Sequence, residues 1–259
     1  MRSSRALTAA AALTFGFLYL PILVLIVFSF NASRYGAGWQ GFTFDWYRRL
    51  FGNRAILSSA VHSFWVAGIS CAAATVLGTS AAVAQGRFFW RRARLWESLF
   101  FAPLLIPELM MGVGFLLFFG LLGWRSGLAT LIVAHTTFNL PIVWLIVRAR
   151  LKKLDPRLED AAMDLGATRW TAFRRITLPL LAPAILSGAL MAFAISLDDF
   201  FISFFVAGPA STTLPIQIYS MLKFSIDPQV NALSAALFLA SMVLVVLAWL
   251  AQGEQPHAQ

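Results

Sequence analysis

Charged side chains are scarce in this sequence. Asp, Glu, Lys and Arg make up only 12% of its 259 residues, whereas hydrophobic residues make up 59% and the mean hydropathy is +0.77. Because a soluble domain normally carries roughly a quarter charged residues, this composition excludes an ordinary soluble protein. It indicates that lipid is the solvent for most of the chain.

Cysteine, histidine and lysine are also rare, and each shortage excludes a class of chemistry. Cys71 is the only cysteine, so no internal disulfide forms, and we expect it to pack among its small neighbours. The three histidines are scattered, and His135 is expected to donate a hydrogen bond between helices rather than bind a metal. No lysine lies in a G-x-x-x-x-G-K-[ST] phosphate loop, and the peptidase motifs H-E-x-x-H, G-x-S-G and G-x-G-D are missing. The sequence therefore predicts no catalytic residue, no metal ligand and no cofactor bound by this chain.

Six apolar runs are long enough to cross a bilayer, whose core of about 30 Å needs roughly 20 apolar residues in a helix. The first run resembles a secretory signal, but it is longer than a signal's apolar part and has no clear cleavage site, so we expect it to be retained. We predict an all-α integral membrane fold, a six-span helical bundle that forms one domain over residues 1–259. The predicted spans are residues 7–30, 57–84, 99–122, 127–147, 182–207 and 233–251.

Basic residues are distributed unevenly between the two sides of the membrane. With the amino terminus inside, the interior segments hold fourteen Lys and Arg residues and the exterior segments hold six. Cytoplasmic loops are enriched in these residues, so both termini are predicted to be cytoplasmic. The net charge of +9 thus follows from topology and does not indicate nucleic-acid binding. The interior set is Arg2, Arg5, Arg87, Arg91, Arg92, Arg94, Arg148, Arg150, Lys152, Lys153, Arg157, Arg169, Arg174 and Arg175.

Small residues recur along two of the predicted spans. In lipid, small side chains let helix backbones approach closely. We therefore expect two ridges to pack against other helices, within the bundle or at a subunit interface. The ridges are Ala184, Gly188, Ala192 and Ser196 in the fifth span, and Gly68, Ala72, Gly78 and Ala82 in the second.

Aromatic residues gather in the first outer loop, at about 31–56. Four aromatics between positions 42 and 47 precede Arg48 and Arg49, a mixture typical of the water–lipid boundary. The loop either anchors the chain at the membrane surface or forms a rim that contacts substrate. On the second interpretation, Trp46 lies on the substrate pathway together with Tyr219 of the third outer loop.

A charged segment, residues 148–178, joins the fourth and fifth spans on the cytoplasmic side. Residues 157–165 are expected to form a helix that ends at Gly166. Glu159 and Asp160 suit its amino terminus, where acids complement the helix dipole. An apolar stripe follows the helical spacing, and a second helix is expected from 169 to 177. The stripe is Leu154, Leu158, Ala161, Ala162 and Leu165. Such a hairpin is either a handle for a soluble partner or an interfacial element that binds lipid headgroups.

This segment resembles the EAA loop of the membrane permeases of bacterial ATP-binding-cassette (ABC) importers. The motif is E-A-A, three residues, G, nine residues, I, one residue, L-P, and its acid position is Asp160 here. The other matching positions are Ala161, Ala162, Gly166, Ile176, Leu178 and Pro179.

The resemblance implies a MetI-like permease that works by alternating access. In that family the loop helix seats in a groove of a separate ATPase subunit, which binds ATP and Mg. It implies ATPase-coupling roles for Glu159, Asp160, Ala161, Ala162, Asp164, Leu165 and Gly166.

Three acids, Glu108, Asp198 and Asp199, lie within predicted spans. Acids inside a membrane are costly and mark functional pathways. No Lys or Arg lies at a matching depth in the sequence, which favours a cationic cargo on a pathway that these acids line. The alternatives are that Glu108 begins a broken half-helix, or that the acids are protonated or bonded between helices.

A second resemblance concerns the cargo. The S-L-D-D-F run at 196–200, G-P at 208–209 and I-Y-S at 218–220 resemble the C-type permease subunits of spermidine/putrescine (polyamine) transporters. This resemblance implies a heterodimer with a second homologous permease, an ABC ATPase dimer and a periplasmic or extracellular solute-binding protein. It places the chain in a bacterial inner (plasma) membrane. The alternatives are a secondary transporter or channel for a cationic solute, and an ABC permease for another small organic solute.

Overall fold

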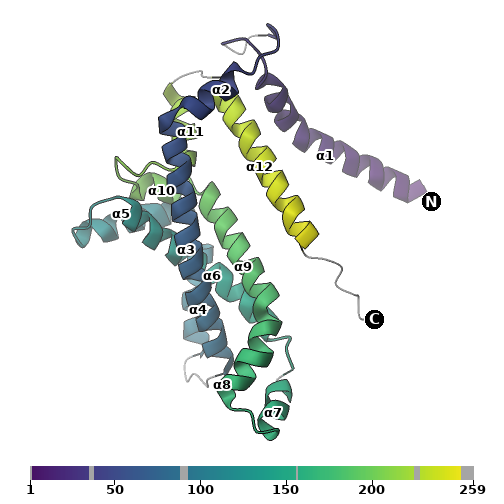
Figure 1. Cartoon of the computed structure of the whole chain (residues 1–259), viewed down its shortest axis with the longest axis vertical. Coiled ribbons are helices and arrows are strands. Elements are labelled where there is room, and N and C mark those ends of the chain that lie inside the picture. The colour runs from purple at the N-terminus through teal and green to yellow at the C-terminus, as the bar shows by residue number, and fades with distance from the viewer. Residues whose placement is uncertain (1, 35–37, 88–92, 156, 225–227, 252–259) are drawn as a thin grey trace. The chain divides into compact units, whose positions relative to one another are not determined.

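The chain folds almost entirely into helices, which confirms the predicted all-α class (Figure 1). The computed structural model describes residues 2–34, 38–87, 93–155, 157–224 and 228–251. Among these residues, an isolated antiparallel bridge joins Asn31 and Phe42. Two compact units are present, one of Met1–Leu57 with Ile218–Gln259 and one of Ser58–Gln217. The helices are α1 (Arg2–Phe28), α2 (Asp45–Gly52), α3 (Arg54–Arg87), α4 (Ala93–Leu105), α5 (Glu108–Leu121), α6 (Leu128–Leu151), α7 (Arg157–Asp164), α8 (Arg169–Ala172), the π-helical turn η1 (Phe173–Thr177), α9 (Leu178–Asp198), α10 (Phe201–Val206), α11 (Leu214–Phe224) and α12 (Gln229–Ala251).

In the first unit, Asn31 organises the loop between α1 and α2. Its Oδ1 accepts hydrogen bonds from the backbone N–H groups of Ser33 (3.2 Å) and Gln40 (2.9 Å). Its Nδ2 donates to the carbonyl oxygen of Gly38 (2.7 Å), and the indole N–H of Trp46 donates to the carbonyl oxygen of Asn31 (2.8 Å). α12 packs against both α1 and α2. Side-chain hydrogen bonds therefore hold this loop in one conformation.

α6 is the central helix of the second unit. It packs against α4, α9 and α10 and buries Val143, Trp144 and Val147 completely (Figure 1). Trp144 stacks on Phe100 of α4 with ring centroids 4.9 Å apart, and its indole N–H donates to Oε1 of Gln85 on α3 at 3.0 Å. Because a buried indole N–H needs a partner, this bond fixes α3 against α6.

Gly78 lets α3 lie directly on α6. A Cβ atom at this position would be 2.9 Å from the carbonyl oxygen of Leu140 and 3.0 Å from the backbone nitrogen of Trp144. Between α3 and α9, the Sγ of Cys71 donates to the carbonyl oxygen of Ala189 at 3.0 Å, so this cysteine packs between helices as predicted. Small residues thus bring three helices into backbone contact.

The ridge of small residues predicted in the fifth span is confirmed, and the one in the second span is half wrong. Gly68 and Ala72 are exposed. Ala72 and Gly78 are six residues apart, a rotation of about 600° around the helix axis. The two residues therefore lie on different faces of the helix. The buried face of α3 follows other positions. Buried residues are Gly188, Ala192 and Ser196 in α9, with Ala184 half-buried, and Ala67, Ser70, Ala74, Gly78 and Ala82 in α3.

Four described helices are long and apolar enough to cross a bilayer, and the bent pair of α4 and α5 raises the number to five. The sixth predicted span, 233–251, extends beyond the residues whose side chains are described, so six spans and one membrane domain stay predictions. Five of the predicted interior basic residues lie outside the described side chains. They are Arg2, Arg5, Arg91, Arg92 and Arg94.

Two predicted spans are broken, which corrects their expected extents. In the third, α4 and α5 meet at 106°, because Pro107 lacks a backbone N–H and disfavours a helical conformation at Ile106. In the fifth, α9 begins earlier than expected and ends at Asp198, and the extended Asp199 (ψ 119°) separates it from α10. The breaks place Glu108 at the first residue of α5 and Asp198 at the last residue of α9.

Candidate functional site

The segment between α6 and α9 forms the predicted helix–turn–helix. α7 ends one residue before its expected end, and Gly166 follows with φ +90°. In this turn the N–H of Gly166 donates to the carbonyl oxygen of Met163 (2.9 Å) and that of Ala167 to Ala162 (3.0 Å). A left-handed residue after a helix favours glycine, which explains why Gly166 stands there. The second predicted helix is divided into α8 and η1, which lead directly into α9.

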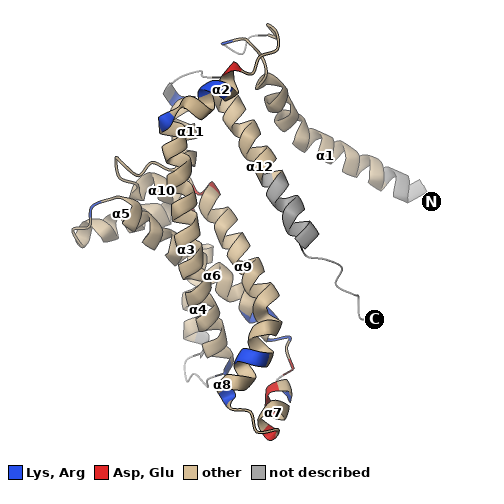
Figure 2. Cartoon of the chain, viewed as in Figure 1, with Lys and Arg blue, Asp and Glu red and all other residues tan. Residues whose placement is uncertain are grey.

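One face of α7 and its turn is exposed. The side chain of Leu165 is 91% exposed, and Asp160, Ala161 and Asp164 are exposed as well. Figure 2 shows positions of acidic and basic residues, coloured on the ribbon, at and near α7 and α8.

Glu159 faces the other way, although it was predicted beside Asp160 as a coupling residue. Its carboxylate forms an ion pair with Arg87 at the end of α3 and accepts a hydrogen bond from the hydroxyl of Thr177. Arg87 also donates to Thr177 Oγ1 (3.2 Å), and its guanidinium lies 4.6 Å from the ring centroid of Phe173. Glu159 and Arg87 therefore fasten α7 to α3 and η1.

Replacing Arg87 by alanine is expected to loosen α7 while the membrane helices stay folded. The ion pair is partly exposed (27% and 26%), so together with the cation–π contact it contributes about 1–2 kcal/mol. Hydrogen exchange of the α7 amides should accelerate roughly five- to thirtyfold. Lys153→Ala, in the exposed turn before α7, is the matched control. Unchanged exchange in Arg87→Ala, or equal acceleration in the control, would contradict this anchoring role.

The acids predicted in the membrane lie at the helix breaks. Glu108 is exposed as the first residue of α5, where its charge complements the helix dipole, and its predicted pathway role stays a prediction. Asp198 is exposed at the end of α9, whereas its neighbour Asp199 is only 7% exposed. Two adjacent carboxylates thus have opposite environments.

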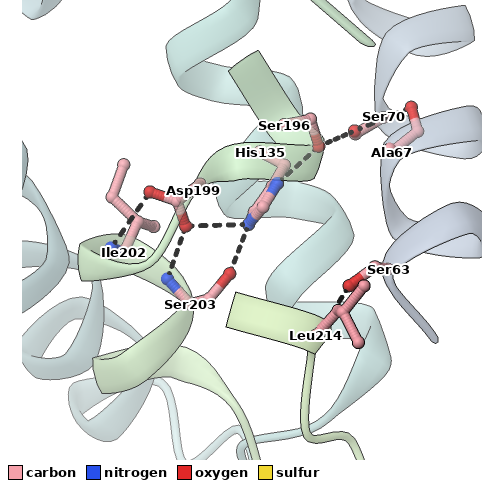
Figure 3. A network of polar contacts seen from close by, with 9 residues as sticks. All are labelled: Ser63, Ala67, Ser70, His135, Ser196, Asp199, Ile202, Ser203 and Leu214. Carbon is pink, nitrogen blue, oxygen red and sulfur yellow. Dashed lines mark hydrogen bonds and ion pairs between the residues drawn. The ribbon is translucent and has the colours of Figure 1, made fainter. Parts of the chain in front are cut away.

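Asp199 belongs to a buried polar network with His135 of α6 (Figure 3). Its Oδ2 lies 3.4 Å from Nε2 of His135, and this nitrogen is 3.0 Å from the hydroxyl of Ser203. On the other side of the ring, Nδ1 lies 2.7 Å from the hydroxyl of Ser196, which in turn is 3.4 Å from that of Ser70 on α3. His135 connects helices as the sequence predicts.

The serines of this network were not predicted as polar contacts. Ser196, Asp199 and Ser203 are spaced by three and four residues, so a helix through them would place all three on one face. That spacing is the signal that could have identified them as partners of one buried group.

The two aromatics predicted on the pathway lie in the first unit. Trp46 is buried at 6% exposure, with its N–H bonded to the loop and the guanidinium of Arg49 at 5.1 Å from its ring centroid. Tyr219 is 41% exposed, and the ammonium of Lys223 lies 5.8 Å from its ring centroid. Of the pair, Tyr219 is the more exposed.

Comparisons with known proteins agree on one family. The family model described as binding-protein-dependent transport system inner membrane component matches residues 74–253. The chain is 42% identical over 232 residues to the spermidine/putrescine transport system permease protein PotC of Escherichia coli (strain K12), covering 90% of this chain and 88% of that protein. It is 40% identical over 244 residues to the putrescine transport system permease protein PotI of the same strain, covering 92% and 87%. Among solved structures, a bacterial ABC transporter involved in the import of the acidic polysaccharide alginate has a similar fold, with a TM-score of 0.70, 16% identity and coverage of 100% and 99%.

Proposed function

Because the chain belongs to the family of binding-protein-dependent transport system inner membrane components, we propose that it is the C-type permease subunit of an ABC importer for polyamines. Membership makes it a membrane permease of an ABC importer, a transport protein rather than a catalyst. The proposed cargo is a small organic cation such as putrescine or spermidine. The observation that supports a polyamine cargo is the similarity to PotC and PotI over about nine-tenths of the chain.

The exposed acids support a cationic cargo. Glu108 and Asp198 are exposed at helix breaks, and within the described part of the chain neither forms an ion pair. Discontinuous helices whose ends face a central site are a recurrent way to bind ions and charged substrates in transporters. The proposed pathway therefore includes Glu108 and the segment of Asp198 and Asp199. For Trp46 and Tyr219, which lie in the first unit, a pathway role stays a prediction from the sequence.

The exposed face of α7 supports the proposed energy source. A separate ATPase dimer, with ATP and Mg bound to it, would receive Asp160, Ala161, Ala162, Asp164, Leu165 and Gly166 in a groove. Glu159 would contribute by anchoring the helix. A second homologous permease and an external solute-binding protein would complete the importer in a bacterial inner membrane, with both termini of this chain in the cytoplasm.

Uptake by the complete importer in proteoliposomes tests the proposal. With ATP and Mg enclosed and loaded binding protein outside, radiolabelled putrescine or spermidine should accumulate, and a proton gradient without ATP should support none. Accumulation driven by the gradient alone would instead identify a secondary transporter. ATP-driven uptake of another solute, without uptake of polyamines, would support an ABC importer but contradict the proposed polyamine cargo.

A further inference from the structure

Arginines at the carboxyl-terminal ends of two helices each pair with an acid and lie over an aromatic ring. Arg87 does so at the end of α3. In the last turn of α6, Arg148 forms an ion pair with Glu97 of α4. We propose that Glu97 and Arg148 are positioning residues that make α4 move together with α6 and α7 during transport. This inference rests on the proposed function, because it names the contacts through which movement driven by the ATPase would reach the broken helix α4–α5.

The side chain of Arg148 is held on two sides. Its guanidinium lies 4.9 Å from the ring centroid of Trp144, one turn earlier on α6, and it also pairs with the carboxylate of Glu97. The Arg148 side chain is only 15% exposed, whereas that of Glu97 is 38% exposed. A cation in the last turn of a helix also interacts favourably with the helix dipole. Arg148 therefore has a defined position on α6, and Glu97 is the partner that approaches it from α4.

Aromatic contacts join α4 to α6 beside this ion pair. Phe100 stacks on Trp144, and the ring of Phe101 meets Trp144 edge-on with centroids 5.3 Å apart. Phe100 and Phe101 follow Glu97 by three and four residues, so all three lie on one face of α4. Aromatic pairs in these geometries stabilise packing beyond the area that they bury. One face of α4 is thus bound to α6 by an ionic contact and two aromatic contacts.

The end of α6 is in turn joined to α3, the helix that holds α7. Besides the indole hydrogen bond between these helices, Gly86 of α3 lies against the side chain of Leu151, the last residue of α6. The next residue of α3 is Arg87, whose ion pair with Glu159 fastens α7. A continuous series of contacts therefore leads from α7, through the ends of α3 and α6, to α4.

At its other end, α4 leads into the break at Pro107, directly before Glu108 of the proposed pathway. The second half of the broken helix, α5, packs against α10. A Cβ atom at Gly112 of α5 would lie 3.1 Å from the carbonyl oxygen of Phe201 on α10. Because α4 is held by α6 and α5 is held by α10, a movement of α4 would change the angle at the break and the position of Glu108.

Charge neutralisation in the complete importer separates coupling from folding. Glu97→Gln should lower the rate of polyamine uptake roughly tenfold, within the range typical of coupling between sites, while loaded binding protein still stimulates ATP hydrolysis to within about twofold of wild type. More ATP is then hydrolysed for each polyamine carried, a change that loss of folded importer would not cause. Arg148→Lys keeps the cation beside Trp144 and should retain most of the uptake. The matched control is Arg150→Gln, because Arg150 is exposed on the same helix end and donates to a carbonyl oxygen, that of Leu180 (3.4 Å).

Crosslinking shows whether α4 and α6 stay together throughout the transport cycle. In a Cys71→Ser background, the importer with Glu97→Cys and Arg148→Cys should carry polyamine slowly. A short bifunctional methanethiosulfonate, with the crosslink verified by mass spectrometry, should restore uptake severalfold because it replaces the ion pair.

Three results would overturn the proposal. A crosslink that leaves uptake slow or abolishes it would show that the two helices must separate. Normal uptake by Glu97→Gln would show that the pair is not needed, and a parallel fall of uptake and ATP hydrolysis in that variant would assign it to folding or assembly. A wild-type importer that carries no polyamine would instead contradict the proposed function.

Discussion

Replacing Leu165 by aspartate is expected to abolish uptake, with a loss of at least about a hundredfold, while the protein still reaches the membrane. Leu165 is almost fully exposed, so the change removes no contact within the chain and should not unfold it. A buried charge without a partner costs several kcal/mol at an interface, which is sufficient to release a docked ATPase. Uptake and co-purification of the ATPase are the measurements.

Two controls make this result specific to docking. Leu165→Met keeps an apolar side chain and should retain uptake. At the next position, Gly166→Arg should abolish uptake, whereas Gly166→Asn should retain much of it because asparagine tolerates the left-handed conformation. Normal uptake by Leu165→Asp, or loss of the protein from the membrane, would refute a docking role for this face.

The second large effect is expected at Gly208, where alanine should destabilise the chain by about 3 kcal/mol. A Cβ atom at Gly208 would overlap the carbonyl oxygen of Ser126 and lie 3.2 Å from the backbone nitrogen of Gly127. Both contacts are with backbone, so no side-chain rotation relieves them. The turn itself is fixed, because the N–H of Gly208 donates to Oγ of Ser211 at 2.8 Å. The thermal midpoint should fall by roughly 6–12 °C for a chain of this size.

Gly120→Ala is the matched control for this substitution. Gly120 also lies in the second unit, but a Cβ atom there meets nothing within 4 Å. The control should keep the wild-type midpoint in the same detergent. Equal midpoints for the two variants would show that the loops around Ser126 and Gly208 are not in close contact.

The segment between α6 and α9 was predictable because its signals are local. Helix α7 needs only its apolar spacing, acids in the first turn and Gly166 after its end, all within ten residues. The breaks in the membrane helices were harder to predict. Hydropathy read over a span of about 20 residues treats α9 and α10 as one apolar run, because the break at Asp199 is stabilised by side-chain contacts and not by a change in composition.

Burial of individual side chains depended on partners that no local pattern reveals. Trp46 has the sequence context of an interfacial aromatic, yet its N–H is bonded to the carbonyl oxygen of Asn31, fifteen residues earlier. Asp199 is separated by 64 positions from His135. Glu159 and Asp160 are neighbours on a short helix, and only the position of Arg87 distinguishes the anchor from the exposed acid.

The length of α3 determines how far a force on the Arg87 anchor can be transmitted. Its 34 residues make a rod about 51 Å long, roughly 20 Å longer than the hydrocarbon core that it crosses. A helix that exceeds the thickness of the hydrocarbon core by this length either tilts or projects beyond the lipid. The carboxyl-terminal end of α3 carries the arginine that holds α7. A force applied to α7 would therefore pass through Arg87 into one continuous helix.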